Sequence, residues 1–397
     1  MNADTGLRLR PITLVDDGGD VLLGDPQTGT FVAIPQVGAV VVRALQRGET
    51  IDTAAAEAER HAGEPVDVGS FVDALRELGF VDEGAGDNAV PRPTAPVQQG
   101  RWVRGPLRER HARLLFAPAA WACYVGAFCF CVAAFAVWPG LWPRSGDVFF
   151  VGDNAGSAIL AILLSYALVC VHEAWHWLAA RALGLSARFG IDRRLYFLVF
   201  ETDLSQLWSV PRRKRYGPQL AGLAIDSVML AALLIAELTT GSGFVAALIY
   251  LKVMTMLWQC MVFLRTDLYG VLVTATGCRN LWSVKSLLLR RAFGRLSARQ
   301  AAELDTADPR DVRVGLVFRW VYLAGFLVAV AYFGYFMVPV IITLLVWSAH
   351  GLAVGPGQVR FWLTAAGSAV LYLPLAGAAA IWLATRLRRQ TGRTARR

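Results

Sequence analysis

Long apolar stretches dominate the chain after about residue 114, whereas the first 83 residues alternate between polar and apolar positions over short periods. About 20 helical residues cross the hydrocarbon core of a bilayer, so six of the apolar stretches are long enough to span a membrane. They are residues 115–138, 156–180, 217–238, 243–264, 314–346 and 359–385. The fifth exceeds one crossing and contains Pro339, which predicts a tilt, kink or break there. We therefore expect a mainly α, polytopic helical membrane protein.

The first 83 residues predict a small α+β domain. Thr50 and Asp52 are candidate caps for the second of its helices. The predicted elements are strands at residues 20–24 and 29–34 and helices at residues 37–45, 51–61 and 68–78.

Composition divides the chain further. Residues 84–100 are rich in Gly, Ala and Pro, which is typical of a flexible linker. The predicted segments are an N-terminal domain at residues 1–83, a linker with a basic juxtamembrane end at residues 84–113, a membrane core at residues 114–285, and additional spans with a basic tail at residues 286–397.

Charge follows the same division. Residues 1–90 hold 16 acidic and 6 basic residues, a net charge of −10, and the remainder holds 14 acidic and 33 basic residues, a net charge of +19. With 55% hydrophobic and only 17% charged residues, the chain is too apolar for an ordinary soluble enzyme. The basic residues cluster beside alternate apolar stretches, as the positive-inside bias produces, and do not indicate nucleic-acid binding. We expect a multi-pass protein of the cell membrane with both termini in the cytoplasm.

The second apolar stretch contains the sequence His172-Glu173-Ala-Trp-His176. Residues four apart lie on one face of a helix, which is the spacing that two imidazoles need to share a zinc ion. Glu173 is then the candidate general base, placed to take a proton from a zinc-activated water. Ionisable groups inside a membrane span are costly and mark a functional site by default. The alternative is a pair of histidines that only cap or pack a buried helix.

A zinc site of this kind needs a third protein ligand and keeps one position for water. Asp267 is the favoured candidate because it follows the fourth apolar stretch, at the depth expected for the two histidines. Glu201, Asp203 and Asp226 are the competing carboxylates. Asp226 lies in the middle of the third apolar stretch, so we also expect it to line the cleft and contact substrate.

Residues 195–204 are aromatic and β-branched, which favours a strand over a helix. A hairpin there can pair its free edge with an extended substrate, because a helical peptide bond must be unwound before water can attack it. The alternative is a hairpin at the membrane surface with no role in substrate binding.

These motifs resemble the site-2-protease class of intramembrane zinc metalloproteases over residues 155–285. Residues 172–184 (HEAWHWLAARALG) are similar to the family pattern H-E-x-x-H-x-x-x-A-x-x-x-G, and Ala221-Gly222 resembles the start of its A-G-P-x-x-N segment. Leu223 and Asp226 replace the Pro and Asn of that segment, and Leu268 replaces the glycine that normally follows the aspartate. The resemblance implies Zn²⁺ held by two histidines and an aspartate on a later helix, which here are His172, His176 and Asp267.

The N-terminal domain resembles the PqqD-like recognition domains of ribosomal peptide pathways, which have a winged-helix fold. The features that match are a strand hairpin with Phe31, an apolar helix, the turn E-T-I-D and the run V-x-x-F-V-x-x-L-x-x-L-G-F-V. In that family a leader peptide adds as a strand to the hairpin, so Phe31 becomes a candidate leader contact. The alternative is a regulatory winged helix with another partner, although an acidic domain makes DNA an unsuitable one.

Together the two resemblances predict a membrane zinc endopeptidase that removes the leader of a ribosomally made precursor peptide, in an arrangement similar to daptide-type pathways. The implied partners are that precursor, the lipid bilayer, and a peptide exporter or modifying enzymes. Two other hypotheses remain open. One is a regulatory intramembrane protease that releases a membrane-tethered regulator, and the other is a non-catalytic membrane adaptor that binds leaders for export.

Overall fold

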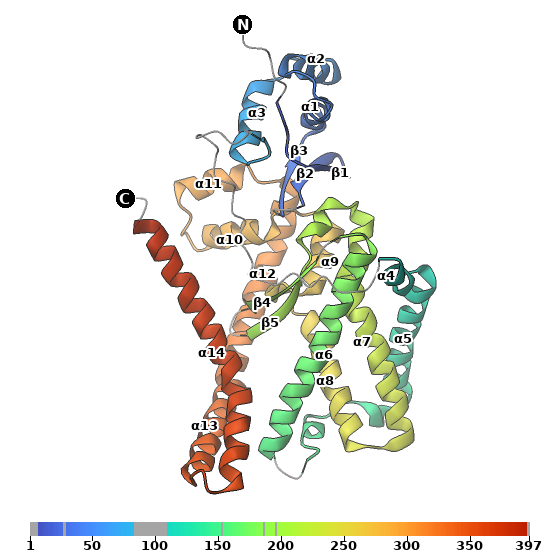
Figure 1. Cartoon of the computed structure of the whole chain (residues 1–397), viewed down its shortest axis with the longest axis vertical. Helices are drawn as coiled ribbons and strands as arrows, with labels where there is room; N and C mark the ends of the chain where they lie inside the picture. Colours follow the sequence, from blue (N-terminus) through green and yellow to red (C-terminus); the bar gives the residue numbers. More distant parts are fainter. Residues whose placement is uncertain are drawn as a thin grey trace.

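A computed structural model describes residues 7–26, 29–82, 109–151, 154–185, 187–194 and 197–394. The chain is mainly helical, and a small domain at residues 7–82, here called the head, lies at one end of a long helical body at residues 109–394 (Figure 1). The three strands of the head lie between its helices and the body (Figure 1). The expected flexible linker at residues 84–100 is outside the described residues.

The head contains the predicted strands and helices and one strand that was not predicted. Its antiparallel sheet has the order β1-β2-β3, and three helices follow. Of the two candidate caps, Thr50 is the one that caps α2, since its hydroxyl accepts the N–H of Thr53. The elements are β1 (Thr13–Asp17), β2 (Asp20–Asp25), β3 (Thr30–Ile34), α1 (Gln36–Gln46), α2 (Ile51–Ala62) and α3 (Val68–Glu77).

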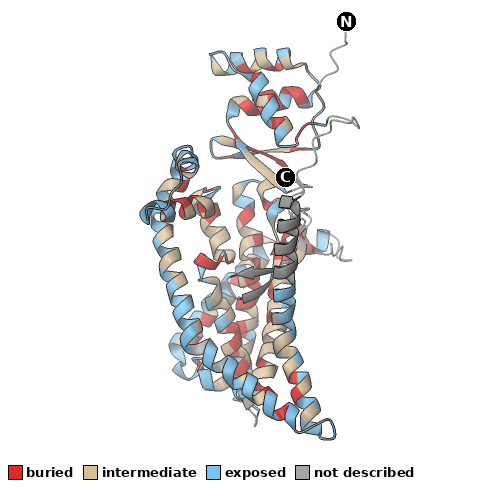
Figure 2. Cartoon of the chain, turned by 90° about the vertical axis from the view of Figure 1, so that its left-hand side faces the viewer, coloured by how far each residue is buried: buried red, intermediate tan, exposed pale blue. Residues whose placement is uncertain are grey.

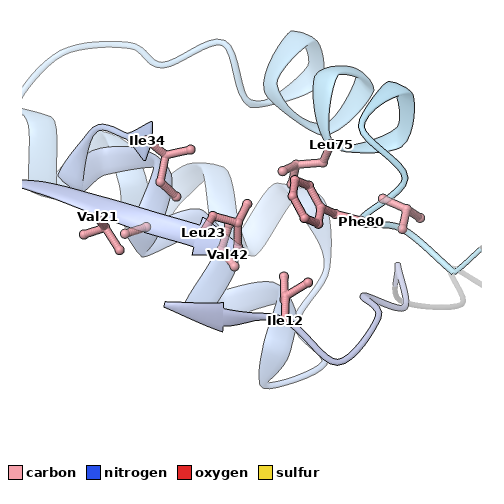
Figure 3. Packing of buried hydrophobic residues seen from close by; sticks show 9 residues of the cluster. Ile12, Val21, Leu23, Ile34, Val42, Leu75 and Phe80 are labelled. Atoms are coloured by element: carbon pink, nitrogen blue, oxygen red, sulfur yellow. The ribbon is translucent and has the colours of Figure 1, made fainter. Parts of the chain in front are cut away.

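A compact apolar core holds the head together. The inward faces of β2 and β3 pack against α1 and the end of α3, with Phe80 in the centre (Figure 3). Its labelled members are Ile12, Val21, Leu23, Ile34, Val42, Leu75 and Phe80 (Figure 3). Burial of this many apolar side chains gives the head a core of its own.

Four helices of the body are long and apolar enough to cross a membrane, which makes this a helical membrane protein. They are α5 (Pro118–Val137), α6 (Asn154–Ala182), α7 (Arg212–Thr240) and α12 (Pro309–Tyr332). Only 17% of the apolar window of α5 and 11% of that of α12 is buried, so most of their apolar side chains face outward. Buried positions concentrate in the head and inside the bundle (Figure 2). Outward apolar surface of this extent is expected where lipid is the solvent.

The fourth predicted span differs from the structure. Helix α8 (Gly243–Gln259) has 17 residues, and the chain then turns through η4 (Val262–Leu264) into α9 (Asp267–Thr276). Arg265 adopts a left-handed backbone conformation between them, with φ of 60°. The periodicity of apolar residues could not reveal this break, because the turn is as apolar as the helix before it.

The fifth predicted span leaves regular α geometry near its proline. Helix α12 passes through a π-helical turn, η5 (Phe333–Met337), into α13 (Val338–Ala353), which has Pro339 in its first turn. Proline lacks the N–H that a regular helix needs, which accounts for an irregular turn at this point. Helix α14 (Val359–Thr394) then packs against α13 and α6. The fifth predicted span is thus divided between α12 and α13. The other five correspond to α5, α6, α7, the shorter helix α8, and α14.

Helix α7 is the central element of the bundle. Half of its apolar window is buried, and it contacts α5, α6, α8 and α9. The remaining elements of the body surround this group. They are α4 (Glu109–Leu115), η1 (Pro139–Leu141), η2 (Ser145–Val148), β4 (Arg188–Arg194), β5 (Phe197–Asp203), η3 (Ser205–Ser209), α10 (Leu281–Ala292) and α11 (Ala298–Asp305). Strands β4 and β5 form the antiparallel hairpin expected between the second and third spans.

The β1–β2 turn of the head is fixed to the body by buried charges. Gly18 and Gly19 have positive φ values, so they make a tight turn that places Asp17 and Asp20 together. The Asp17 carboxylate lies 3.3 Å from the Arg215 guanidinium of α7, and Asp20 lies 2.8 Å from Arg279. Asp17 is 6% exposed and Arg215 is 2% exposed. The acidic head therefore meets the basic body through specific ion pairs.

We expect Asp17→Asn to loosen the head from the body, because it leaves the buried Arg215 without its counter-ion. Loss of one partner of a buried pair costs about 3 kcal/mol, which is about a hundredfold in the opening equilibrium. Hydrogen exchange should quicken in β1 and η3. Asp16→Asn is the matched control, since its side chain is 77% exposed. Equal exchange in the two variants would contradict the role given to Asp17.

Candidate metal centre

Helix α6 presents His172 and His176 on one buried face, one helical turn apart. They are 5% and 1% exposed, and their Nε2 atoms are 3.1 Å from each other. Glu173 is next to them and half-buried, and the three side chains bring their ligand atoms within 4.8 Å of one another. The group can hold a metal ion, as the spacing of the motif predicts.

Asp267 approaches the same point from the start of α9. Its Oδ2 lies 2.9 Å from His172 Nε2 and 3.0 Å from His176 Nε2. Gln259, at the end of α8, accepts the backbone N–H of Asp267 at 3.1 Å and the hydroxyl of Thr266 at 2.7 Å. These bonds fix the turn that delivers the carboxylate. The structure thus brings together the three residues expected to bind metal.

Two of the competing carboxylates have other surroundings. Asp203 accepts hydrogen bonds from the backbone N–H and the hydroxyl of Ser205, which closes a local turn after β5. Glu201 lines the cavities beside the histidines. Asp226, the third competitor, lies behind His172, on the opposite side of the ring from Asp267.

The hydrogen bonds made by the Nδ1 atoms of the two imidazoles indicate the state of their Nε2 atoms, which face the centre. His176 Nδ1 is 2.6 Å from the carbonyl oxygen of Pro218, which can only accept, so Nδ1 carries the hydrogen. His172 Nδ1 is 2.8 Å from the Asp226 carboxylate, which also accepts. In neutral rings both Nε2 atoms are then unprotonated. They meet a carboxylate oxygen at hydrogen-bond distance, and the Gln259 amide nitrogen lies 3.3 Å from His172 Nε2. A bound cation, or protonation of a ring, satisfies this set of atoms.

Close packing of α7 against α6 makes this geometry possible. A Cβ atom added at Gly222 would lie 2.4 Å from His172 Nε2 and 2.5 Å from His176 Nε2. Any larger residue would therefore push into the two metal-facing nitrogens. Gly222 belongs to the Ala-Gly pair that carries part of the resemblance noted in the sequence, and close backbone approach is the physical reason for a glycine there.

Asp226 joins His172 to a buried lysine. One carboxylate oxygen contacts His172 Nδ1, and the other accepts a hydrogen bond from Lys252 Nζ of α8 at 2.6 Å. Asp226 and Lys252 are each 1% exposed. Both oxygens thus have partners, which favours a role in orienting His172 over the expected contact with substrate. Lys252 was not identified from the sequence, although a lone lysine within an apolar span is itself a signal of buried pairing.

The β4–β5 hairpin contacts the candidate general base. Thr202 of β5 donates its backbone N–H to Glu173 Oε2 at 2.7 Å, and its hydroxyl donates to the Glu173 carbonyl at 2.9 Å. The carboxylate of Glu173 is thereby held at the edge of the sheet. Thr202 lies in the segment expected to form a strand, but its contact with Glu173 depends on a tertiary approach that local sequence does not encode.

Two cavities meet at this centre. An inner cavity of about 420 Å³ is lined by His172, Glu173 and His176 together with apolar residues of α6 and α8. A second cavity of about 660 Å³, here called the chamber, lies on the side of the head. Asp267, Glu201 and Leu204 line both. Burial raises the pKa of Tyr269, in the wall of the chamber, to about 12, so this phenol stays neutral.

Phe31 lies far from the metal centre, on β3 of the head. Its ring covers Gly24 of the neighbouring strand, where an added Cβ atom would lie 1.9 Å from the ring. A larger residue at position 24 would displace the ring. Phe31 is thus part of the sheet surface of the head and remains a predicted leader contact.

Comparison of the chain with protein-family models, with curated proteins and with solved structures finds no match.

We expect Asp226→Ala to weaken metal binding by about 10- to 100-fold, because the ring of His172 loses the group that orients it. Zinc titrated against a competing chelator measures the affinity of the purified full-length protein. Asp203→Ala is the matched control and should bind zinc as the unaltered protein does, since Asp203 bonds only to Ser205 among the contacts described. Equal affinities for the two variants would rule out the positioning role.

Proposed function

We propose that the protein is a membrane-embedded zinc endopeptidase that cleaves a ribosomally made precursor peptide. The observation that carries the proposal is the convergence of His172, His176 and Asp267 on one point inside an apolar helical bundle, with Glu173 beside them. A pair of histidines that only caps or packs a helix would not require a carboxylate from a later helix to face both of their Nε2 atoms.

Zinc suits this set of ligands. It binds imidazole nitrogen and carboxylate oxygen at about 2.0–2.2 Å. Atoms at the corners of a triangle with sides of 2.9–3.1 Å can all reach one ion at that distance. His172, His176 and Asp267 would hold the ion. When bound, zinc supplies Lewis acidity, which polarises a peptide carbonyl and makes water more acidic.

Glu173 then performs the proton transfers. Its carboxylate lines the inner cavity and is held by the N–H of Thr202 at the edge of β5. From there it accepts the proton of the attacking water and donates it to the departing amine. The low dielectric of the buried site strengthens each of these interactions.

Strand β5 supports the presentation of substrate in an extended form. It pairs with β4 on one side only, and its other side reaches Glu173 through Thr202. A peptide that adds along this edge would lie next to the general base with its amide bonds unwound. This supports a hairpin that aligns substrate rather than one that only rests at the membrane surface.

The head supports a precursor peptide as the substrate. Its three-stranded sheet and three helices are compatible with the winged-helix, PqqD-like fold, and β3 is an edge strand of the sheet. A leader that adds to β3 would be held at the body by the Asp17 ion pairs, which raises the effective concentration of the peptide at the centre. We place both termini in the cytoplasm, because the Arg-rich segments lie on the side of the head.

We expect Glu173→Gln to lower the rate of precursor cleavage by about 10²- to 10⁴-fold while zinc stays bound, since only the proton acceptor is lost. The substrate is a precursor peptide encoded beside the protein, and the products are weighed by mass spectrometry with and without chelator. Glu303→Gln on the exposed face of α11 is the control. A fully active Glu173→Gln variant would show that Glu173 is not the base.

We expect Asp267→Asn to lower both zinc content and cleavage, because an amide oxygen is a weaker ligand than a carboxylate. Asp203→Asn should change neither. Metal analysis of the purified variants, made in parallel with the cleavage assay, separates a ligand from a residue that only affects turnover. If Asp267→Asn retains full zinc occupancy, the third ligand must be another residue.

A further inference from the structure

The chamber connects the head to the candidate metal centre. Its walls are η3, the start of α7, the turn before α9, and parts of α9, α10 and α12. At its inner end it shares Asp267, Glu201 and Leu204 with the cavity that holds the two histidines. The chamber therefore lies next to the centre, with Asp267 in the wall that the two cavities share.

The head lies at the outer end of this chamber. Arg215 and Arg279, which line the chamber, are the residues that bind Asp17 and Asp20 of the head. Ser205, also in the chamber wall, lies against Gly29 at the turn between β2 and β3. A polypeptide leaving the sheet of the head thus meets the chamber first.

The wall of the chamber binds carboxylates, and one of its cations has none. Arg215 and Arg279 each pair with a carboxylate of the head. Arg265 is exposed, and among the described residues it forms no ion pair; its guanidinium lies 5.5 Å from the centre of the Trp282 ring. An aromatic ring on one side leaves the donors of the guanidinium fork available for a carboxylate.

The position of Arg265 relative to the centre is fixed. Within the described part of the chain it is the one non-glycine residue with positive φ, at 60°. That conformation is costly for arginine and persists where the surrounding structure requires it. The next two residues are tied to Gln259 by the Thr266 hydroxyl and the Asp267 N–H. The backbone of Arg265 is therefore held next to that of Asp267, the third candidate ligand.

We propose that the chamber admits the substrate from the side of the head as an extended, water-exposed peptide, an inference that rests on the proposed function. Arg265 binds an acidic side chain of that peptide at a fixed distance from the bond that is cleaved. The substrate class is then a peptide with an Asp or Glu near its cleavage site rather than an uninterrupted transmembrane helix. The position of the chamber between the head and the inner cavity, with which it shares Asp267, favours a peptide over an anionic lipid headgroup.

The test uses the full chain in nanodiscs of phosphatidylcholine and a proteome-derived peptide library, with cleaved products identified by mass spectrometry. Arg265→Asn removes the charge while retaining a residue that tolerates the left-handed backbone. Arg265→Glu reverses the charge. Arg299→Asn, on the exposed surface of α11, is the matched control. Zinc content is measured in each variant to verify that the centre is intact.

We expect the unaltered protein to favour peptides with Asp or Glu at one position relative to the cleaved bond. Arg265→Asn should lower kcat/KM for those peptides by about 10- to 100-fold and leave neutral peptides unaffected. Arg265→Glu should shift the preference to Lys or Arg at the same position, and Arg299→Asn should change nothing.

The outcomes separate this inference from the proposed function. If the unaltered protein cleaves the precursor peptide but no library peptide, only the inference is overturned, and if it cleaves neither, both fail. If it cleaves peptides without an acidic preference, or with one that Arg265→Asn retains, only the inference is overturned. An effect of Arg265→Asn that appears in nanodiscs with phosphatidylglycerol but not in phosphatidylcholine would assign Arg265 to lipid headgroups and would also overturn it.

Discussion

Ionisable groups buried in an apolar bundle must each find a partner, and this requirement organises the protein around α7. Lys252 pairs with Asp226, Asp226 holds His172, and both histidines face Asp267. This series of contacts ends at His176, whose Nδ1–H donates to the carbonyl oxygen of Pro218 in α7. An unpaired charge there would cost several kcal/mol, so the members of the network stabilise one another's positions. A metal ion would complete a network whose protein groups are already in place.

The same requirement explains how the two differently charged parts of the chain combine. The body carries a large positive charge, and part of it is buried at Arg215, below the head. The carboxylates of the β1–β2 turn neutralise that site and Arg279 beside it. The acidity of the head therefore has a structural use within the chain, separate from any recognition of a basic partner. The start of α7 thus contributes to the contact between the domains, and its middle contributes to the candidate centre.

Local patterns in the sequence predicted the elements that depend on local physics. The helical spacing of His172 and His176, the cap at Thr50 and the strand character of β5 all follow from neighbouring residues. Strand β1 was missed although the Gly18-Gly19 pair is a recognised hairpin signal, because Asp16 and Asp17 hide the apolar alternation. Asp267 could be proposed from its expected depth. Lys252, Gln259 and Arg215 could not be assigned partners, since their contacts join residues between 26 and 198 positions apart.

The ends of the membrane spans are where the prediction and the structure differ most. Apolarity alone does not show where a helix ends when the following turn is equally apolar, as at the end of α8. That early end has a structural result: it lets the chain double back and present Asp267 to α6. A continuous fourth span would have carried the carboxylate past the histidines.

The unbroken course of α7 has a practical consequence for dissecting the protein. Arg215 and Gly222 are seven residues apart, about 10 Å along the same helix. A truncated protein without residues 1–83 would retain Arg215 but lose its partner Asp17. The unpaired guanidinium would then lie two helical turns from Gly222, which packs against His172 and His176. Inactivity of such a fragment would combine damage to the chamber with loss of the proposed peptide capture, so intact chains with single substitutions are the sounder way to separate the two.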